Sequence, residues 1–247
     1  MKNPKTIRWR DIKFINQQGI SVDRDVLPAS LITVPSAPAL VENYNNPFYN
    51  SAVRSSDFSI IDSALLAMLC RLYMIRIHRY SGFRLLLDLF DYLRDKHLRV
   101  FLVDPTGKTG AANRKYLMSN TCLSEEEIGS YVAPFYPSKA PIEDPVLLGL
   151  INGFKPDLVI LGIAGGKQEV LGDYLRRNVQ NKTTIVCTGA ALSFFTGEQA
   201  RITDAVDKYY LGWLARIFRN PRVFLPRYLN AARFIPLFFR HKVEFQR

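Results

Sequence analysis

The chain has 247 residues, 48% hydrophobic and 12% aromatic, so it can bury a sizeable core, and disorder over most of its length is excluded. Lysine and arginine number 33 against 22 acidic residues, which gives a net charge of +11 and a pI near 9.7. This charge predicts an anionic partner: nucleic acid, a phosphate-bearing substrate or a lipid surface. Composition does not choose among the three.

The cysteine spacing and the hydropathy of the chain indicate the cellular compartment in which the protein is expected. Cys70, Cys122 and Cys187 lie far apart and form no C-x-x-C pair, which is not the pattern of a zinc site or a disulfide framework and favours a reducing cytoplasm. Residues 1–14 are basic, but no apolar segment follows them, and no window of 18 uninterrupted apolar residues occurs anywhere. We therefore expect neither an export signal nor a membrane-spanning helix.

Short apolar runs alternate with segments of helical periodicity between residues 30 and 200. Ser81–Arg94 has apolar residues at helical spacing and predicts a helix with Ser81 as its N-cap. Four prolines between positions 134 and 145 predict a loop that leads into a helix near Val146. The alternation predicts an α/β fold with a mostly parallel sheet. Its expected strands are Leu31–Val34, Phe58–Ile61, Val100–Val103, Leu158–Leu161 and Thr184–Cys187.

The composition changes after residue 200. Residues 201–247 hold ten Lys or Arg and three Asp or Glu, which is +7 of the total charge, interleaved with aromatic residues. This pattern predicts one or two basic amphipathic helices, broken near Pro221 and Pro236. We expect a core of residues 1–200 and a basic carboxyl-terminal appendage of residues 201–247.

Asp104–Thr109 reads DPTGKT directly after an expected strand. It is not a phosphate-binding loop of the NTPase type, because that pattern requires glycine at position 102, where this chain has Leu. Backbone N–H groups of residues 109–111 at a helix start remain able to hold a diphosphate. A simple turn from strand to helix is the favoured interpretation.

Asp62 follows the apolar run FSII, so its carboxylate is expected at the carboxyl edge of the sheet, where α/β folds bind ligands. Two hypotheses compete. Asp62 caps the helix that begins at Ser63 or Ala64, or it acts as a general base toward a hydroxyl nucleophile. Position alone does not decide between them.

Two further segments combine a strand end, glycine and a helix start. LGIAGGKQE (161–169) places Lys167, Gln168 and Glu169 on the first turn of a helix, and CTGAALSFFTG (187–197) repeats the arrangement. Two such edges side by side predict a nucleotide or sugar crevice. The three histidines have neither metal-ligand spacing nor an evident nucleophile partner, so ordinary structural roles are favoured for His78, His97 and His241.

Several of these motifs occur in the order and spacing of one family, and over Leu31–Leu229 the sequence resembles the WecG/TagA/CpsF family of bacterial glycosyltransferases. The resemblance is strongest in the carboxyl-terminal third. It rests on Thr33, Asp62, Arg79 with Gly82, GKQE (166–169), TGAALSFFTG (188–197), Arg201 and LGWLARIFRNPRVFLPRYL (211–229).

The resemblance implies a Rossmann-like core with a carboxyl-terminal appendage that meets the membrane. It implies an inverting, metal-independent transfer of a sugar from a nucleotide donor, usually UDP-linked, to an acceptor on a polyprenyl diphosphate. Such proteins act peripherally at the cytoplasmic face of the inner membrane in the biosynthesis of surface polysaccharides such as exopolysaccharide, alongside other assembly enzymes. Eight Lys or Arg after residue 210, at ~1 kcal/mol each, are enough for reversible binding to an anionic surface.

The resemblance also assigns roles to residues. Asp62 is the expected general base. Substrate binding falls to Thr33, Arg79, Gly82, Gln168, Glu169, Gly189 and Ser193, of which Thr33 and Gln168 are expected to hold uridine or ribose. Helix-start amides near Gly189, with Arg216, Arg222 and Arg227, are expected to stabilise the leaving diphosphate. Trp213 is either a packing anchor or a sugar platform, and packing is favoured.

The chain departs from the family pattern at four positions, where Pro35, Gly166, Ser193 and Gly212 stand for Asn, Pro, Asp and Glu. An alternative function is therefore a non-catalytic, membrane-docked subunit of a polysaccharide assembly complex. Nucleic-acid binding is disfavoured, because the arginines of the carboxyl-terminal segment lie among bulky apolar residues and prolines rather than over a stacking platform.

Overall fold

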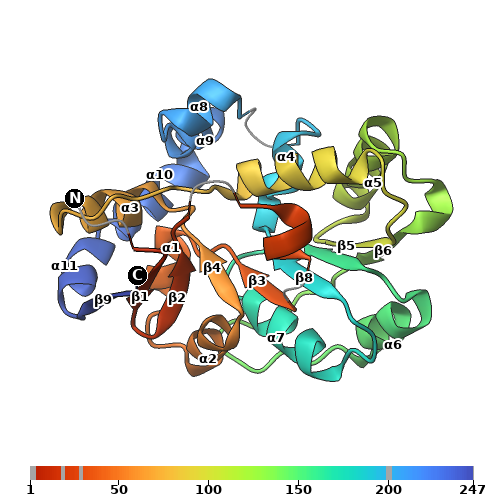
Figure 1. Cartoon of the computed structure of the whole chain (residues 1–247), viewed down its shortest axis with the longest axis horizontal. Helices are drawn as coiled ribbons and strands as arrows, with labels where there is room; N and C mark the ends of the chain where they lie inside the picture. Colours follow the sequence, from red (N-terminus) through yellow and green to blue (C-terminus); the bar gives the residue numbers. More distant parts are fainter. Residues whose placement is uncertain (1–3, 18–19, 28–29, 199–201, 247) are drawn as a thin grey trace.

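The computed structural model describes residues 4–17, 20–27, 30–198 and 202–246, so Arg201 lies outside the described residues. Within those ranges the strands form a nine-stranded sheet in the order β6-β5-β7-β8-β3-β4-β2-β1-β9 (Figure 1). The strands from β6 to β2 run parallel, whereas β1 is antiparallel to both of its neighbours, β2 and the edge strand β9. The expected α/β fold with a mostly parallel sheet is confirmed.

The five expected strands are confirmed to within one residue at each end. They are β3 (Leu31–Thr33), β4 (Phe58–Ile60), β5 (Val100–Asp104), β7 (Leu158–Leu161) and β8 (Thr184–Cys187). Four further strands lie outside the expected set: β1 (Thr6–Trp9), β2 (Ile12–Ile15), β6 (Ile128–Val132) and β9 (Val243–Gln246).

Helices cover both faces of the sheet. Successive strand residues point to opposite sides, so each strand contributes side chains to both faces. Leu31 and Leu161 face one side, which α1 (Ala37–Glu42), α2 (Pro47–Ser55), α6 (Pro145–Phe154) and α7 (Gln168–Asn178) cover. Ile32 and Ile160 face the other, against α4 (Gly82–Leu93), α5 (Gly107–Asn120), the π-helix η1 (Val22–Val26) and the 3₁₀ helix η3 (Gly189–Phe194). Burial on both faces explains why the central strands are continuous apolar runs.

Local signals set the limits of two expected helices. Ser81 is the N-cap of α4, and its hydroxyl accepts from the N–H of Arg84 at 3.0 Å. Helix α6 begins at Pro145 after the proline-rich loop, and Asp144 caps it by accepting from the N–H of Leu147 at 2.8 Å. The remaining short elements before residue 200 are α3 (Ala64–Leu72) and the 3₁₀ helix η2 (Glu125–Glu127).

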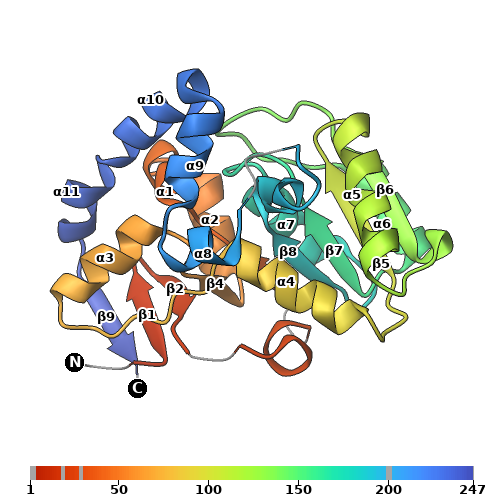
Figure 2. The same cartoon turned by 90° about the horizontal axis from the view of Figure 1, so that it is seen from above.

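The carboxyl-terminal segment forms α8 (Asp204–Lys208), α9 (Gly212–Arg219), α10 (Pro221–Ala231), α11 (Phe234–Phe239) and β9, and Figure 2 shows this run passing beside α1 and α3. The expected break near Pro221 is confirmed. The break expected near Pro236 falls at residues 232–233, because α10 ends at Ala231 and Pro236 lies in the first turn of α11. A first turn needs no intrahelical N–H, so proline is tolerated there.

Aromatic packing anchors the end of this segment. Phe234 and Phe238 are fully buried against Trp9, whose indole N–H donates to the carbonyl of Phe238 at 3.2 Å. Strand β9 pairs with β1, so the chain returns to the sheet. The domain boundary at residue 200 and the role of residues 201–247 as an appendage stay predictions. No helix in the described ranges has the length and apolar composition that crossing a membrane requires.

Candidate functional site

The candidate site lies at the carboxyl edge of the sheet. Because β3, β4, β5, β7 and β8 are parallel, the residues that follow them meet at one edge. The chain leaves β5 toward β6 and leaves β7 toward β8, in opposite directions across the sheet. Such a reversal, here between β5 and β7, is where open α/β sheets bind ligands, and Asp62 follows β4 farther along the same edge.

Asp62 lies two residues beyond the end of β4, and 31% of its side chain is exposed. Its Oδ1 accepts from the N–H of Gly82, the first residue of α4, at 3.1 Å. The hypothesis that Asp62 caps α3 is wrong: Ser63 is the N-cap, and its hydroxyl accepts from the N–H of Leu66 at 3.2 Å. The Asp62 carboxylate therefore lies at the carboxyl edge of the sheet and has no capping role in α3.

Arg79 joins Asp62 to the carboxyl-terminal segment. Its Nε donates to the Asp62 carbonyl at 2.9 Å, and its Nη2 lies 3.8 Å from Asp62 Oδ1. Its Nη1 donates to both the carbonyl and Oδ1 of Asp207 on α8, each at 3.0 Å, and Ser81 donates to Asp207 Oδ2 at 2.9 Å. The guanidinium also lies 4.8 Å from the ring centre of Tyr210. Asp207 was missed by sequence analysis, because nothing local marks its contact with Arg79.

Gly82 brings α4 close to the neighbouring strand ends. A Cβ atom at this position would lie 3.3 Å from Val34 Cγ1 and 3.8 Å from Ala191 Cβ. Ala191 belongs to η3, which follows β8, so Gly82 connects the Asp62 edge with the second glycine segment. The structure therefore brings the predicted residues Asp62, Arg79 and Gly82 together.

A second cluster joins the GKQE segment to Gly189. Gln168 Oε1 accepts from the N–H of Gly189 at 2.7 Å, and Gln168 Nε2 donates to Glu169 Oε1 at 3.1 Å. Glu169 is fully buried and accepts from the N–H of Gly166 at 2.7 Å. Burial raises the pKa of the Glu169 carboxyl, and these hydrogen bonds oppose the rise. The cluster is a closed network rather than a set of free donors.

Gly166 shows how this chain accommodates a departure from the family pattern. Its φ is +90°, which proline cannot adopt, and a Cβ would lie 2.6 Å from Nδ2 of Asn43. The loop before α7 therefore requires glycine here and packs directly against the end of α1.

Thr33 and Ser193, like Gln168 and Glu169, are predicted binding residues that are buried. Thr33 has no exposed surface, and its hydroxyl is hydrogen-bonded to that of Ser59 at 2.6 Å. Ser193 is 6% exposed within η3. Their roles in donor binding stay predictions, and a side-chain contact from Thr33 to a ligand would have to replace the bond to Ser59.

The DPTGKT segment is the strand-to-helix turn that the sequence favours. Thr106 caps α5 by accepting from the N–H of Thr109 at 3.1 Å, and Gly110 donates to the Thr106 carbonyl, so these two N–H groups are already paired. Asp104 is 2% exposed, and burial raises the pKa of its carboxyl to about 6, against the effect of a 2.7 Å hydrogen bond from Asn113.

The three predicted leaving-group arginines lie on α9 and α10. The guanidinium of Arg216 stacks over the ring of Phe194 in η3 at 4.6 Å, which places it beside the second glycine segment. Arg227 lies 3.9 Å from Glu42 at the end of α1, and Arg222 is exposed. Trp213 packs on Tyr228 with ring centres 6.1 Å apart and is 44% exposed.

The histidines have ordinary partners. His241 Nε2 is 2.7 Å from the Tyr44 hydroxyl, and the exposed His97 pairs with Glu127 at 3.0 Å. Across the described ranges, no three His, Cys, Asp or Glu side chains gather as a metal site would require.

A family model described as "Glycosyl transferase WecG/TagA/CpsF family" matches residues 20–247. No curated protein gives a significant match.

Proposed function

Because the chain belongs to the WecG/TagA/CpsF family of glycosyltransferases, enzymes of bacterial polysaccharide biosynthesis, we propose that it transfers a sugar, with inversion, from a nucleoside-diphosphate donor to a lipid-linked acceptor. UDP is the expected nucleotide and a polyprenyl diphosphate the expected carrier. The observation that carries this proposal is the position of Asp62, a partly exposed carboxylate at the carboxyl edge of the parallel sheet.

Asp62 is proposed as the general base. It takes the proton from the acceptor hydroxyl as that oxygen forms a bond to the anomeric carbon, while the bond from this carbon to the diphosphate oxygen breaks and the nucleoside diphosphate leaves with the electron pair. The Gly82 N–H and Arg79 hold Asp62 in place. A positioned base of this kind contributes about 10²–10⁴-fold to the rate.

The leaving diphosphate needs positive charge. The N–H of Gly189 is engaged by Gln168, so the proposal relies on Arg216, Arg222 and Arg227 rather than on this amide. Arg216 is the nearest of the three to the second glycine segment, through Phe194. Charge developing on the leaving oxygen is best stabilised by such preorganised cations. We expect transfer to need no metal ion, and turnover in a chelator tests this.

Membrane docking is proposed from exposed apolar side chains that are flanked by arginines. Tyr73, beyond α3, packs on Phe238 and Phe239, so α3 and α11 present one surface. We propose that this surface and the exposed faces of α9 and α10 meet the anionic cytoplasmic face of the inner membrane. The exposed side chains are Met68, Leu72, Tyr73, Met74, Trp213, Phe218, Val223, Leu225, Leu229, Ile235 and Phe239.

The test measures nucleoside diphosphate release from a panel of UDP- and GDP-sugars, with a polyprenyl-diphosphate-linked sugar acceptor in anionic vesicles. Wild type is compared with Asp62→Asn and with Asp91→Asn, an exposed carboxylate on α4 that pairs with Arg94. We expect acceptor-dependent release with one donor, a loss of at least 100-fold in Asp62→Asn and full activity in Asp91→Asn.

Release that Asp62→Asn leaves unchanged would exclude Asp62 as the base. No release with any donor, despite firm vesicle binding by wild type, would favour the non-catalytic subunit, and Pro35 and the buried Ser193 would be the first positions to revert.

A further inference from the structure

A polar cavity that is largely open to solvent lies away from the carboxyl edge that carries Asp62. It has a volume of 710 Å³ and lies between the turn that joins β1 to β2 and the residues from Tyr44 through α2. Two arginines, Arg10 and Arg54, line it together with the neutral polar residues Asn45, Asn50 and Ser51. Its lining contains no Asp or Glu among the described residues.

Arg10 is held firmly at the wall of this cavity. Its Nη1 donates to the carbonyl of Tyr44 at 3.1 Å, and its guanidinium carbon lies 4.0 Å from the centre of the Tyr44 ring. Burial and the neighbouring Arg54 lower the pKa of Arg10. A guanidinium stacked in this way is preorganised to bind a planar or tetrahedral anion with its remaining N–H groups.

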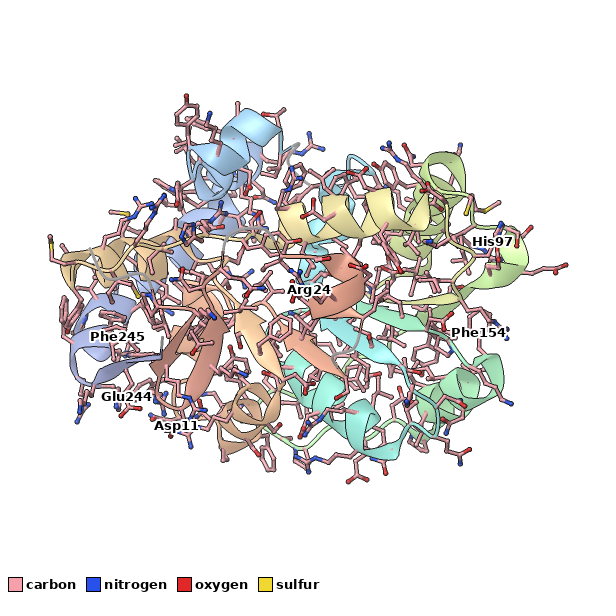
Figure 3. The ribbon with its side chains drawn as sticks, viewed as in Figure 1. Asp11, Arg24, His97, Phe154, Glu244 and Phe245 are labelled. Atoms are coloured by element: carbon pink, nitrogen blue, oxygen red, sulfur yellow. The ribbon has the colours of Figure 1, made fainter. Side chains whose placement is uncertain are left out.

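Arg54, on the last turn of α2, completes the pair. Its Nε donates to the carbonyl of Arg10 at 3.0 Å, so the backbone of the turn fixes its position. The nearest carboxylate is Asp11, whose Oδ2 lies 3.8 Å from Arg54 Nη2 and whose side chain is 77% exposed (Figure 3 labels Asp11 at the turn, next to α2). Asp11 also raises the pKa of Arg10, so it offsets part of the positive charge of the arginine pair.

The surroundings add to the positive potential. His241 is hydrogen-bonded to the hydroxyl of Tyr44, and burial together with Arg10, Arg240 and Arg54 lowers its pKa. Three arginines therefore lie close enough to act on one imidazole beside the cavity.

Two carboxylates lie next to the lining: Asp11 beside Arg54, and Asp173, which accepts from the lining Ser55 at 2.8 Å and is itself paired with Arg176 and Arg177. The lining groups themselves, two fixed guanidinium groups with neutral amide and hydroxyl neighbours, are complementary to an anion.

We propose that this cavity binds a phosphate group through Arg10 and Arg54, with Asn45 and Ser51 as neutral donors. The site is separate from the proposed active site, because none of the residues predicted for sugar transfer lines it. Inorganic phosphate, a soluble phosphomonoester and the phosphate of an anionic lipid share the chemistry that these groups recognise.

The experiment titrates the full-length protein with inorganic phosphate by calorimetry and compares wild type with Arg54→Gln, Arg94→Gln and Arg216→Gln. Arg94 is an exposed arginine that follows α4, and Arg216 belongs to the proposed active site. We expect at least tenfold weaker binding in Arg54→Gln, with wild-type affinity in Arg94→Gln, whereas Arg216→Gln reports whether phosphate binds at the proposed active site instead. The melting temperature of Arg54→Gln, measured without phosphate, reports whether the variant is folded, and Arg54→Lys should recover part of the affinity.

A second arm measures sedimentation with phosphatidic acid vesicles against phosphatidylcholine vesicles, and separates a lipid phosphate from a soluble one. Loss of phosphate-dependent binding in Arg54→Gln in either arm supports the site and identifies the source. Binding that only Arg216→Gln weakens would assign phosphate to the active site and overturn the proposal. Equal binding by all four proteins, or none in either arm, would overturn it as well.

Discussion

The central strands and the carboxyl-terminal helices are both rich in apolar residues, but the strands bury these residues and the helices expose many of them. Residues 100–103 of β5 are at most 3% exposed, because helices cover both faces of the sheet. On α9 and α10, Phe218 is 79% exposed and Leu229 is 67% exposed. Burial of apolar surface contributes about 25 cal/mol per Å² to stability, so the residues of β5 stabilise the fold. The exposed apolar residues of α9 and α10 contribute little to stability and are the ones proposed above to dock on the membrane.

Helix α11 combines buried and exposed apolar residues. Phe234 and Phe238 are fully buried against Trp9, whereas Ile235 and Phe239 of the same helix are 41% and 50% exposed. The helix is therefore anchored to the sheet on one side and open on the other. Because α11 follows α9 and α10 and is anchored to the sheet, the exposed apolar side chains of α9 and α10 are not explained by a loosely attached chain end.

The largest expected effect comes from comparing a substitution of a buried phenylalanine with a substitution of an exposed one. Phe234→Ala should lower the free energy of unfolding by about 3–5 kcal/mol, because it leaves a cavity beside Trp9, whereas Phe218→Ala should change it by less than about 0.5 kcal/mol. Chemical denaturation measures both. Vesicle sedimentation should show the reverse order, with Phe218→Ala the weaker binder. A stability loss at Phe218 that matches the loss at Phe234 would show that α9 packs in a core.

A second prediction concerns a polar residue inside the covered sheet. The folded-state pKa of Asp104 is about 6 and the ordinary value is 3.8, so its stabilising contribution is complete below pH 3.8 and is lost as pH rises toward and through 6. The two-unit difference corresponds to about 3 kcal/mol. Asp104→Asn should therefore raise the free energy of unfolding at pH 8 and change it little at pH 4. Parallel stability curves for the two proteins from pH 4 to pH 8 would contradict this assignment.

The third prediction tests the junction between the two regions. Asp207→Asn keeps the size of the side chain but removes the charge that holds Arg79, and both side chains are less than a fifth exposed. We expect a loss of about 1 kcal/mol in stability and a fall of about tenfold in kcat through misplacement of Asp62, with KM for the donor little changed. The matched control Asp91→Asn, in an exposed pair on α4, should change neither quantity. A change confined to stability would assign Asp207 a purely structural role.

The parts of the fold that sequence predicted are those with local signals. Buried parallel strands are unbroken apolar runs, and Ser81 and Pro145 mark helix starts by their own chemistry. The strand β1 pairs with β9 from the other end of the chain, which no local pattern reveals. The turn between β1 and β2 uses Arg10 and Asp11, both with positive φ, in place of the usual Asn-Gly, so this hairpin lacked its strongest signal.

The functional residues also differ in whether a local sequence signal reveals them. A carboxylate at a strand end located Asp62, and the resemblance supplied Arg79 and Gly82, which the structure brings into contact with it. Asp207 and the pair of Arg10 and Arg54 depend on tertiary contacts between residues far apart in the sequence, so spacing did not reveal them.

The most direct test of the comparison is the effect of anionic vesicles on turnover of one acceptor, for wild type and for Phe218→Ser with Leu229→Ser. Wild type should accelerate at least tenfold when vesicles are added, and the double variant should lose this acceleration while its melting temperature stays unchanged. Equal turnover with and without vesicles, or equal acceleration in both proteins, would contradict the proposal that the apolar faces of α9 and α10 dock on the membrane.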